Sequence, residues 1–267
     1  MTCGALIFAF NNEHIDYVAM ANWSANNIHR HLNIPVCLVT DREPPAGHVF
    51  DRVVLVDTPT GSGVRHFVDI GESVAWHNTN RVDAYTLSPW DQTLVLDADY
   101  VVASNQLKTV LSSNQDFLCY RWASDATNLR NFDDLNYFGQ NRMPMWWATV
   151  MMFKRSNTAQ LIFESMNMVR DNWLHYRRLY NNPTPNYRND HALSIALNIV
   201  NGHTLSVPSM PGSLVSVTPE HQVTQLSQDS YRVDFLTPDQ KPRYIELHQD
   251  FHAMGKQQLG AIVANPC

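Results

Sequence analysis

The stretch LVLDADYVV, residues 94 to 102, decides how the rest of the sequence is interpreted. Three apolar residues lead directly into Asp97 and Asp99, and two valines follow shortly after. Residues two apart in extended backbone face the same side, so the two carboxylates repel each other unless a cation lies beside them. Apolar neighbours make uncompensated carboxylates costly. The stretch therefore predicts a strand that ends at a site for a hard divalent cation, although an ordinary polar turn after a strand has the same short pattern.

Upstream of this stretch, short apolar runs alternate with segments of helical spacing. In the first helical segment, Ile15, Val18, Ala21, Ala25 and Ile28 recur every three or four residues. Predicted strands are 5–10, 35–39, 52–56 and 93–96, predicted helices are 14–31 and 78–87, and 58–63 is a small-residue loop. This alternation is typical of a largely parallel sheet with crossover helices. In such sheets, ligands bind at the carboxyl ends of the strands, where Asp97 and Asp99 lie.

The second half of the chain mixes strands and helices. Predicted strands are 117–120, 147–154, 204–207, 214–217, 232–235 and 243–247, and predicted helices are 158–176 and 190–200. Residues 121–145 are polar and are expected to form a long surface excursion, with Asp125, Asp133 and Asp134 in solvent. No segment has the composition of a domain linker.

The composition is that of a globular protein with few surface charges. Of 267 residues, 44% are apolar and 16% are charged, and the net charge is -6. This charge argues against polyanion binding driven by bulk electrostatics. The 4 cysteines are widely separated, so neither a disulfide framework nor a zinc knuckle is expected. The apolar runs are too short for a membrane span, and no signal peptide is recognised, so we expect a soluble cytoplasmic protein.

Residues 81 to 102 carry a resemblance to a known family. Arg81 and Tyr85 lie on the helix that leads, through a Ser-Pro-Trp turn, into the strand before Asp97. This arrangement resembles the donor-site segment of nucleotide-sugar-dependent glycosyltransferases with the GT-A fold, of the glycogenin and lipopolysaccharide-galactosyltransferase kind. Residues 4 to 41 are similar to the first unit of that fold. The resemblance is closer still to uncharacterised members of the group in tailed-phage genomes.

The resemblance covers most of residues 4 to 256 and implies an α/β fold. That fold is a GT-A (Rossmann-like) mixed, mostly parallel sheet flanked by helices. We expect residues 1–267 to form a single domain, with a nucleotide-binding half at 1–102 and an acceptor and sugar half at 103–267.

The resemblance also implies roles for residues of the nucleotide-binding half. Asp97 and Asp99 would hold Mn²⁺ or Mg²⁺ on the donor diphosphate, with Asp97 also near the ribose. Asp41 would lie near the base, and its ordinary alternative is a turn or capping aspartate. Arg65 and Arg81 are candidate phosphate or sugar contacts, and either has the alternative of a surface ion pair.

A third metal ligand is expected near the C-terminal end. In the family pattern, a metal-binding His follows a strand, a Gly comes about three residues later, and a Lys then reaches the diphosphate. His252 and Gly255 fit this spacing, but Lys256 follows the Gly at once, and His248 lies where the predicted strand ends. The ligand therefore stays open between His248 and His252, with His252 favoured. A nitrogen ligand shifts metal preference from Mg²⁺ toward Mn²⁺.

Asp190 stands at the start of the helix predicted for 190–200, after a Pro- and Asn-rich loop. Its ordinary interpretation is helix capping, which stabilises by about 1 kcal/mol. The resemblance implies instead that it lies under the transferred sugar, where it could also serve as a base. Trp146 and Trp147, at the start of the strand predicted for 147–154, are candidates to stack on a sugar or base.

Together these features predict a metal-dependent glycosyltransferase. We expect it to transfer a sugar from a nucleoside diphosphate sugar, a UDP-sugar above all, to a hydroxyl acceptor. The resemblance implies retention of anomeric configuration. If the phage likeness holds, a hydroxymethylated pyrimidine in DNA is an acceptor candidate and the location is the host cytoplasm; a surface glycan is the other candidate.

Other functions compete for the same motif. A phosphatase of the haloacid-dehalogenase kind would use Asp97 as nucleophile and Asp99 as general acid, but it needs a later acidic pair after another apolar strand. Asp133 and Asp134 follow no such strand. A nucleotidyltransferase would open with a Gly-rich basic loop, which residues 10–13 lack. A non-catalytic nucleotide- or carbohydrate-binding protein on the same scaffold is the remaining alternative.

Overall fold

A six-stranded sheet forms the centre of the molecule in the computed structural model, which describes residues 2–57, 64–67, 72–75, 80–184, 186–204 and 207–265. The side chains of 64–67 and 72–75 are outside the described part. The strand order is β3-β2-β1-β6-β12-β8, and only β12 runs opposite to the other strands of this sheet. The strands are β1 (Cys3–Phe8), β2 (Val36–Thr40), β3 (Arg52–Leu55), β6 (Gln92–Asp97), β8 (Phe117–Tyr120) and β12 (Trp147–Lys154). The predicted fold class, an α/β mixed and mostly parallel sheet flanked by helices, is confirmed.

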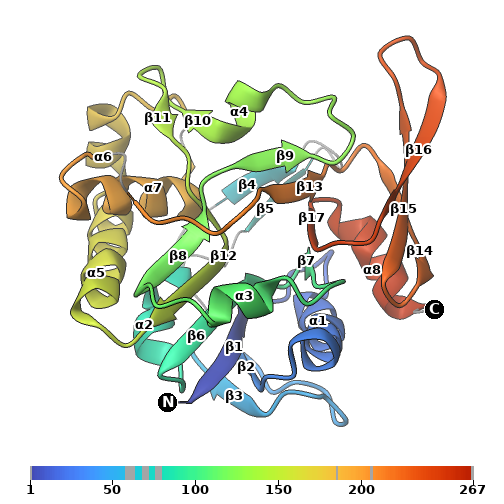
Figure 1. Ribbon diagram of the computed structural model, residues 1–267, viewed down its shortest axis with the longest axis horizontal. Coiled ribbons are helices and arrows are strands. Elements are labelled where there is room, and N and C mark those ends of the chain that lie inside the picture. Colours follow the sequence, from blue (N-terminus) through green and yellow to red (C-terminus); the bar gives the residue numbers. More distant parts are fainter. Residues whose placement is uncertain are drawn as a thin grey trace.

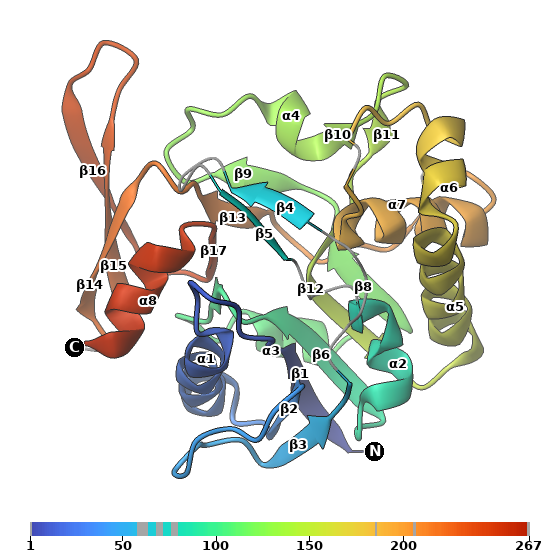
Figure 2. The same ribbon diagram turned by 180° about the vertical axis from the view of Figure 1, so that it is seen from behind.

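Helices cover both faces of this sheet, which explains why its central strands are continuous apolar runs. Ala5 and Ile7 of β1 pack with α1 (Tyr17–Leu32) on one face. Leu6 and Phe8 pack on the other face with α5 (Asn157–Asp171) and α7 (Asn189–Val200). Figures 1 and 2 show α1 on one side of the sheet and α5 with α7 on the other.

The carboxyl ends of the parallel strands meet at one edge of the sheet. In the register, Phe8 of β1 pairs with Val39 of β2 and with Asp97 of β6. Asp41 follows two residues after Val39, just past the end of β2. The edge expected to bind a ligand is therefore the edge at which both aspartates lie.

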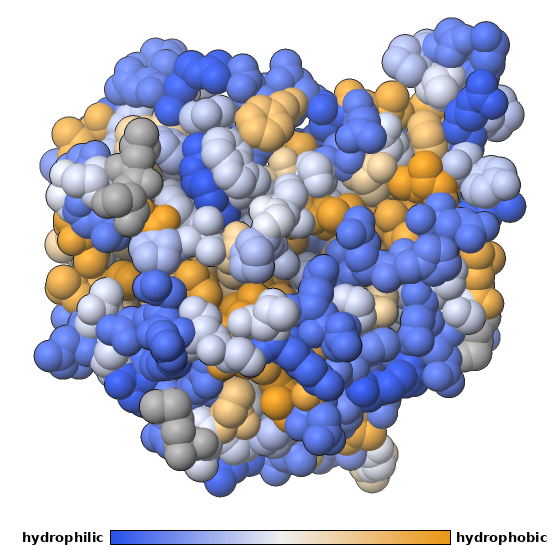
Figure 3. Space-filling view, in the orientation of Figure 1, coloured by the Kyte–Doolittle hydropathy of each residue, from blue (hydrophilic) through white to orange (hydrophobic). Residues whose placement is uncertain are grey.

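A second sheet adjoins this edge, with the order β7-β17-β13-β9. Its strands are β7 (Tyr100–Val101), β9 (Ala123–Asp125), β13 (Leu214–Val217) and β17 (Phe251–Ala253). A third sheet consists of β14 (Gln222–Ser227), β15 (Ser230–Leu236) and β16 (Pro242–Leu247). It projects from the body beside α8 (Lys256–Ala264), and its far end is hydrophilic (Figure 3).

The remaining elements are short. They are β4 (Val64–Phe67), β5 (Glu72–Ala75), the 3₁₀ helix η1 (Asn80–Asp83), α2 (Ala84–Leu87), α3 (Leu107–Leu111), α4 (Phe132–Asn136), β10 (Tyr137–Phe138), β11 (Met143–Pro144) and α6 (Trp173–Leu179). No helix within the described residues combines the length and apolar character needed to cross a bilayer. Cys3, Cys37 and Cys119 are free thiols.

Several predicted elements differ from the structure. The helix expected over 158–176 is two helices, α5 and α6, because the backbone breaks at Asn172 (φ -117°, ψ 33°). Of the helix expected over 78–87, residues 80–87 form a 3₁₀ turn followed by one α-helical turn, and residues 78 and 79 lie outside the described residues. The polar excursion 121–145 contains β9, α4, β10 and β11. The loop at 58–63, and residues 205 and 206 of the strand predicted at 204–207, lie outside the described residues.

Candidate metal centre

The two aspartates of the central motif lie where the main sheet passes into the second sheet. Asp97 is the last residue of β6, and Asp99 is the last residue of the turn that leads into β7. Strand β17 pairs antiparallel with β7, with His252 opposite Tyr100. The backbone N–H of Ala253 also donates to the carbonyl of Asp99 at 3.0 Å. This pairing brings His252 beside the aspartates across a large separation in sequence.

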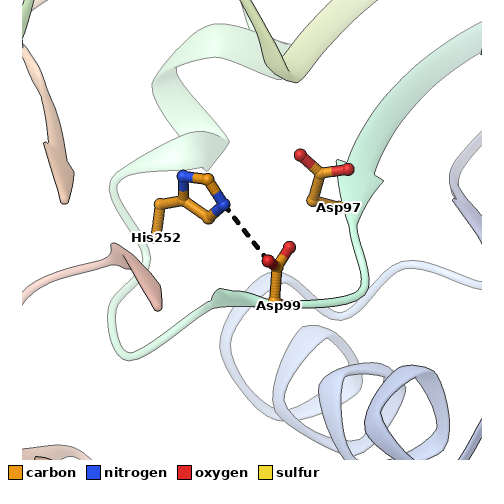
Figure 4. A group of neighbouring side chains, drawn as sticks. All are labelled: Asp97, Asp99 and His252. Carbon is orange, nitrogen blue, oxygen red and sulfur yellow. Dashed lines mark hydrogen bonds and ion pairs between the residues drawn. The ribbon is translucent and has the colours of Figure 1, made fainter. Parts of the chain in front are cut away.

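The side chains of Asp97, Asp99 and His252 converge (Figure 4). One ligand atom from each lies within 4.8 Å of the others. His252 Nε2 is 3.2 Å from Asp99 Oδ2, and the side chains are 17%, 7% and 11% exposed in the order given. Two carboxylates and an imidazole, largely shielded from water, are a donor set that suits a divalent cation of the Mn²⁺ type. The three side chains therefore fit the metal that the sequence predicts.

The ammonium of Lys256 already contacts this group. Lys256 is the first residue of α8, and Gly255 is the N-cap. Lys256 Nζ forms an ion pair with Asp99 Oδ2, the same oxygen that faces His252. One carboxylate oxygen thus has two positively charged or protonatable neighbours.

His248, the alternative metal ligand, lies elsewhere. Its side chain is 66% exposed, and its Nε2 is 3.7 Å from Glu246 Oε2 at the end of β16. Of the two histidines, the structure brings only His252 to the aspartates.

Arg81 supports the centre from inside the protein. It is 2% exposed, forms an ion pair with Asp97 Oδ1, and donates from an Nη to the carbonyl of Ala148 at 2.7 Å. Burial lowers the pKa of Arg81 to about 10, so the guanidinium stays charged at neutral pH. The expected phosphate or sugar contact is therefore a side chain that faces Asp97 and the backbone of β12 rather than solvent.

Asp190 reaches the same residue of β12 from the first turn of α7. Its Oδ1 accepts from the N–H of Ala148 at 2.9 Å, and its Oδ2 accepts from Arg188 at 2.9 Å. Burial alone would raise the pKa of Asp190, but the charge of Arg188 and the Ala148 N–H outweigh it and hold the pKa below its ordinary value. Asp190 is thus ionised. Because Arg81 and Asp190 bind the carbonyl and the N–H of one residue, they connect Asp97 to the start of α7.

The other predicted site residues have the following places. Asp41 lies at the carboxyl edge of the parallel strands with its side chain nearly buried, 3.4 Å from Arg42 Nε. Arg65 belongs to β4, and its side chain is outside the described residues. Trp146 and Trp147 are both buried in the core. Their rings therefore do not lie open to stack on a sugar.

Two further aspartates have structural roles that hydrophobic sequence patterns do not predict. Asp125, expected in solvent, is buried and accepts from Thr127 Oγ1 at 2.7 Å and from the N–H of Leu129 at 2.8 Å. Asp250 is also buried, and its Oδ1 accepts from the Ala103 N–H and Ser104 Oγ, both at 2.9 Å. Asp250 thereby ties the start of β17 to the segment after β7. A Thr two residues after Asp125 is the local signal for the first turn; no local signal marks the second contact.

Comparison with known proteins yields structural likeness only. No protein-family model matches the sequence, and no curated protein sequence matches it. Solved structures that are similar include the galactosyltransferase LgtC in complex with donor and acceptor sugar analogues, at 12% identity and a TM-score of 0.48 over 73% of this chain and 70% of that chain.

Two further similar structures are also glycosyltransferases. GlyE of Streptococcus pneumoniae is 11% identical, with a TM-score of 0.43 over 79% of this chain and 46% of its own. Mouse xyloside xylosyltransferase 1 is 10% identical, with a TM-score of 0.45 over 78% of this chain and 85% of its own. This chain thus spans less than half the length of GlyE. With TM-scores below 0.5, these likenesses assign neither a donor nor an acceptor, and the case for function depends on the side chains described above.

Proposed function

We propose that this protein is a metal-dependent glycosyltransferase that transfers a sugar from a nucleoside diphosphate sugar to a hydroxyl acceptor. The observation that carries the proposal is the convergence of Asp97, Asp99 and His252, with Lys256 beside them, at the carboxyl edge of the parallel strands. A diphosphate carries several negative charges, and a divalent cation together with a nearby ammonium group offsets them. We expect the donor to be a UDP-sugar.

The roles of the acidic group follow from its contacts. Asp97 presents a carboxylate whose orientation is set by buried Arg81, and Asp99 and His252 complete the ligand set. A bound Mn²⁺ or Mg²⁺ would neutralise the charge that develops on the departing diphosphate. Lys256 would bind the part of the diphosphate that the ion does not reach.

In the reaction, the bond between the anomeric carbon and the diphosphate oxygen breaks, and a bond from that carbon to the acceptor oxygen forms. The acceptor hydroxyl gives its proton to the departing diphosphate oxygen, and the nucleoside diphosphate is released. We expect Asp190, ionised and fixed by Arg188 and the Ala148 N–H, to contact hydroxyls of the transferred sugar. Because both of its oxygens already accept hydrogen bonds, a positioning role suits Asp190 better than that of a base.

The finer assignments follow from the resemblance. Residues 1–102 would bind the nucleotide, with Asp41 near the base and Arg65 near the phosphates, and residues 103–267 would bind the sugar and acceptor. We expect retention of configuration, with a hydroxymethylated pyrimidine in DNA or a surface glycan as acceptor, and action in the cytoplasm.

A panel of nucleotide sugars tests the proposal without knowledge of the acceptor. Thermal stabilisation and slow donor hydrolysis are measured with Mn²⁺, with Mg²⁺ and with a chelator. We expect one donor to stabilise the protein only when metal is present, and we expect Asp99→Asn to abolish this effect. Asp133→Asn is the matched control, because Asp133 lies in the exposed first turn of α4, where it pairs with Arg142.

The same panel separates the alternatives. Undiminished donor turnover by Asp99→Asn would refute the assignment. UDP binding without sugar release or transfer would select a non-catalytic binding protein. Release of phosphate from simple monoesters would select the phosphatase, although its required acidic pair, Asp133 and Asp134, lies in α4 and not at the end of a buried strand.

A further inference from the structure

Asp99 Oδ2 is contacted by two groups at once. His252 Nε2 lies 3.2 Å from it, and the Lys256 ammonium forms an ion pair with it. Asp99 is also one of the three residues that can hold a cation. An ammonium ion-paired with that oxygen repels a divalent ion bound to the same carboxylate, because two positive charges at such close range raise each other's energy. The ammonium therefore weakens the binding of the ion.

We propose that Lys256 is an exchangeable counter-ion of Asp99, which leaves that carboxylate only when a diphosphate accepts the ammonium. This inference rests on the proposed function and adds to it the order in which metal and donor bind. Metal alone binds weakly because it must displace Lys256, whereas metal and nucleoside diphosphate bind together. The side chain that inhibits metal binding in the absence of donor then becomes a ligand of the donor.

The position of Lys256 explains why its ammonium needs an anion both in the protein without metal and in the protein with metal and diphosphate bound. Lys256 is the first residue of α8, whose first turn contains no acidic residue. A positive charge at a helix N-terminus is unfavourable, because the helix dipole is positive there. Asp99 compensates this charge in the metal-free protein. Once a metal takes Asp99, a diphosphate is the next anion of suitable charge at this place, and the flexible lysine stem allows the ammonium to turn to it.

The partial burial of the Lys256–Asp99 ion pair determines how strongly it lowers the affinity for Mn²⁺. The side chains of Lys256 and Asp99 are 16% and 7% exposed, so the ion pair is not that of an open surface. Hydrogen bonds to charged groups are strong enough that removing such a competitor changes a binding constant by about ten- to a hundredfold. Lys256→Met, which keeps the length of the side chain and loses the charge, should therefore bind Mn²⁺ about ten- to a hundredfold more tightly than the native protein.

The test measures Mn²⁺ binding by electron paramagnetic resonance of the free ion, in four proteins without nucleotide: native, Lys256→Met, Asp99→Asn and the double variant. We expect the gain in Lys256→Met to disappear in the double variant. With saturating Mn²⁺, calorimetry should show weaker UDP binding to Lys256→Met. Lys241→Met is the matched control, because it removes an exposed lysine from a pair with Asp239. Circular dichroism checks the fold, and Lys256→Gln provides a second neutral side chain.

Each result is decisive for one of the two proposals. If Lys256→Met and Lys256→Gln bind Mn²⁺ no more tightly than the native protein, the counter-ion exchange is wrong. The proposed function still stands in that case, provided that UDP promotes Mn²⁺ binding in the native protein. If UDP promotes no Mn²⁺ binding in the native protein and Asp99→Asn behaves identically, the proposed function fails, and the counter-ion exchange fails with it.

Discussion

Replacing Arg81 by Met tests whether the buried guanidinium is needed to hold Asp97. Arg81 is almost fully buried, and Asp97 has little exposure, so water cannot replace the lost partner. Removing one member of a buried ion pair typically costs about 3–5 kcal/mol, because it leaves an uncompensated charge. The carbonyl of Ala148 also loses its donor. We therefore expect Arg81→Met to lower the free energy of unfolding by about 3–5 kcal/mol, which corresponds to about 6–20 °C in the melting temperature.

A double-mutant cycle makes this prediction specific. Urea unfolding is measured for Arg81→Met, Asp97→Asn and the double variant at pH 7. Since the amide introduced by Asp97→Asn carries no charge, the double variant should recover most of the loss caused by Arg81→Met. Arg142→Met, which removes an exposed partner of Asp133, should cause no measurable loss. If Arg81→Met costs less than about 1 kcal/mol, or if the two changes add without coupling, Arg81 does not act through Asp97.

Three further changes probe other parts of the fold. Asp190→Asn should lower the free energy of unfolding at pH 7 and leave it unchanged in acid. Because the pKa of the folded Asp190 carboxyl lies below the unfolded value of about 3.8, its stabilising contribution is present above that value and is lost as the pH falls through the folded pKa. Urea unfolding at several pH values measures this difference. Burial lowers the pKa of His191 to about 3, so the free energy of unfolding should fall by up to about 1.4 kcal/mol for each unit by which the pH is lowered from 6.5 to 3. His191→Phe should flatten this dependence of stability on pH. Equal slopes in the native protein and the variant would contradict the burial argument. Gly4→Ala should cost about 1–3 kcal/mol and alter tryptophan fluorescence, because the new Cβ would meet Trp90 at 2.4 Å and the carbonyl of Pro35 at 2.8 Å; an unchanged melting temperature would show that Trp90 can move aside.

The sequence was most informative where burial is continuous. Strands β8, β12 and β13 have the bounds that the sequence predicts. For β8 and β12 the reason is burial on both faces of the main sheet, which favours a nearly continuous apolar run. The position of Asp97 at the carboxyl edge of the sheet was also predictable, because Asp97 directly follows the buried apolar run of β6. By contrast, β17 has only three residues, and its position depends on pairing with β7 and β13 rather than on any local pattern.

The same limit applies to the candidate site. The motif predicted that Asp97 and Asp99 lie at this edge, and the family resemblance left the expected third ligand open between His248 and His252, with His252 favoured. Which histidine comes close to the aspartates depends on which one lies opposite Tyr100. Arg81 was recognisable as a basic residue near the motif, whereas its burial against Asp97 is a property of tertiary packing. The hydrophobic periodicity of the sequence marks neither the helix break at Asn172 nor the burial of Asp125. Local pattern thus predicted which residues lie at this edge of the sheet, and long-range pairing determined how their side chains meet.

The pairing of β17 with β7 also has a consequence during synthesis on the ribosome. His252 and Asp99 are 153 residues apart in the chain, so Asp99 emerges long before His252 and Lys256, the two groups that contact its carboxylate. Closing so long a loop is entropically slow and comes late in folding. A nascent chain that has not yet released residues 252 to 256 therefore carries Asp99 without these partners. We expect cellular divalent ions to bind there more readily before Lys256 emerges.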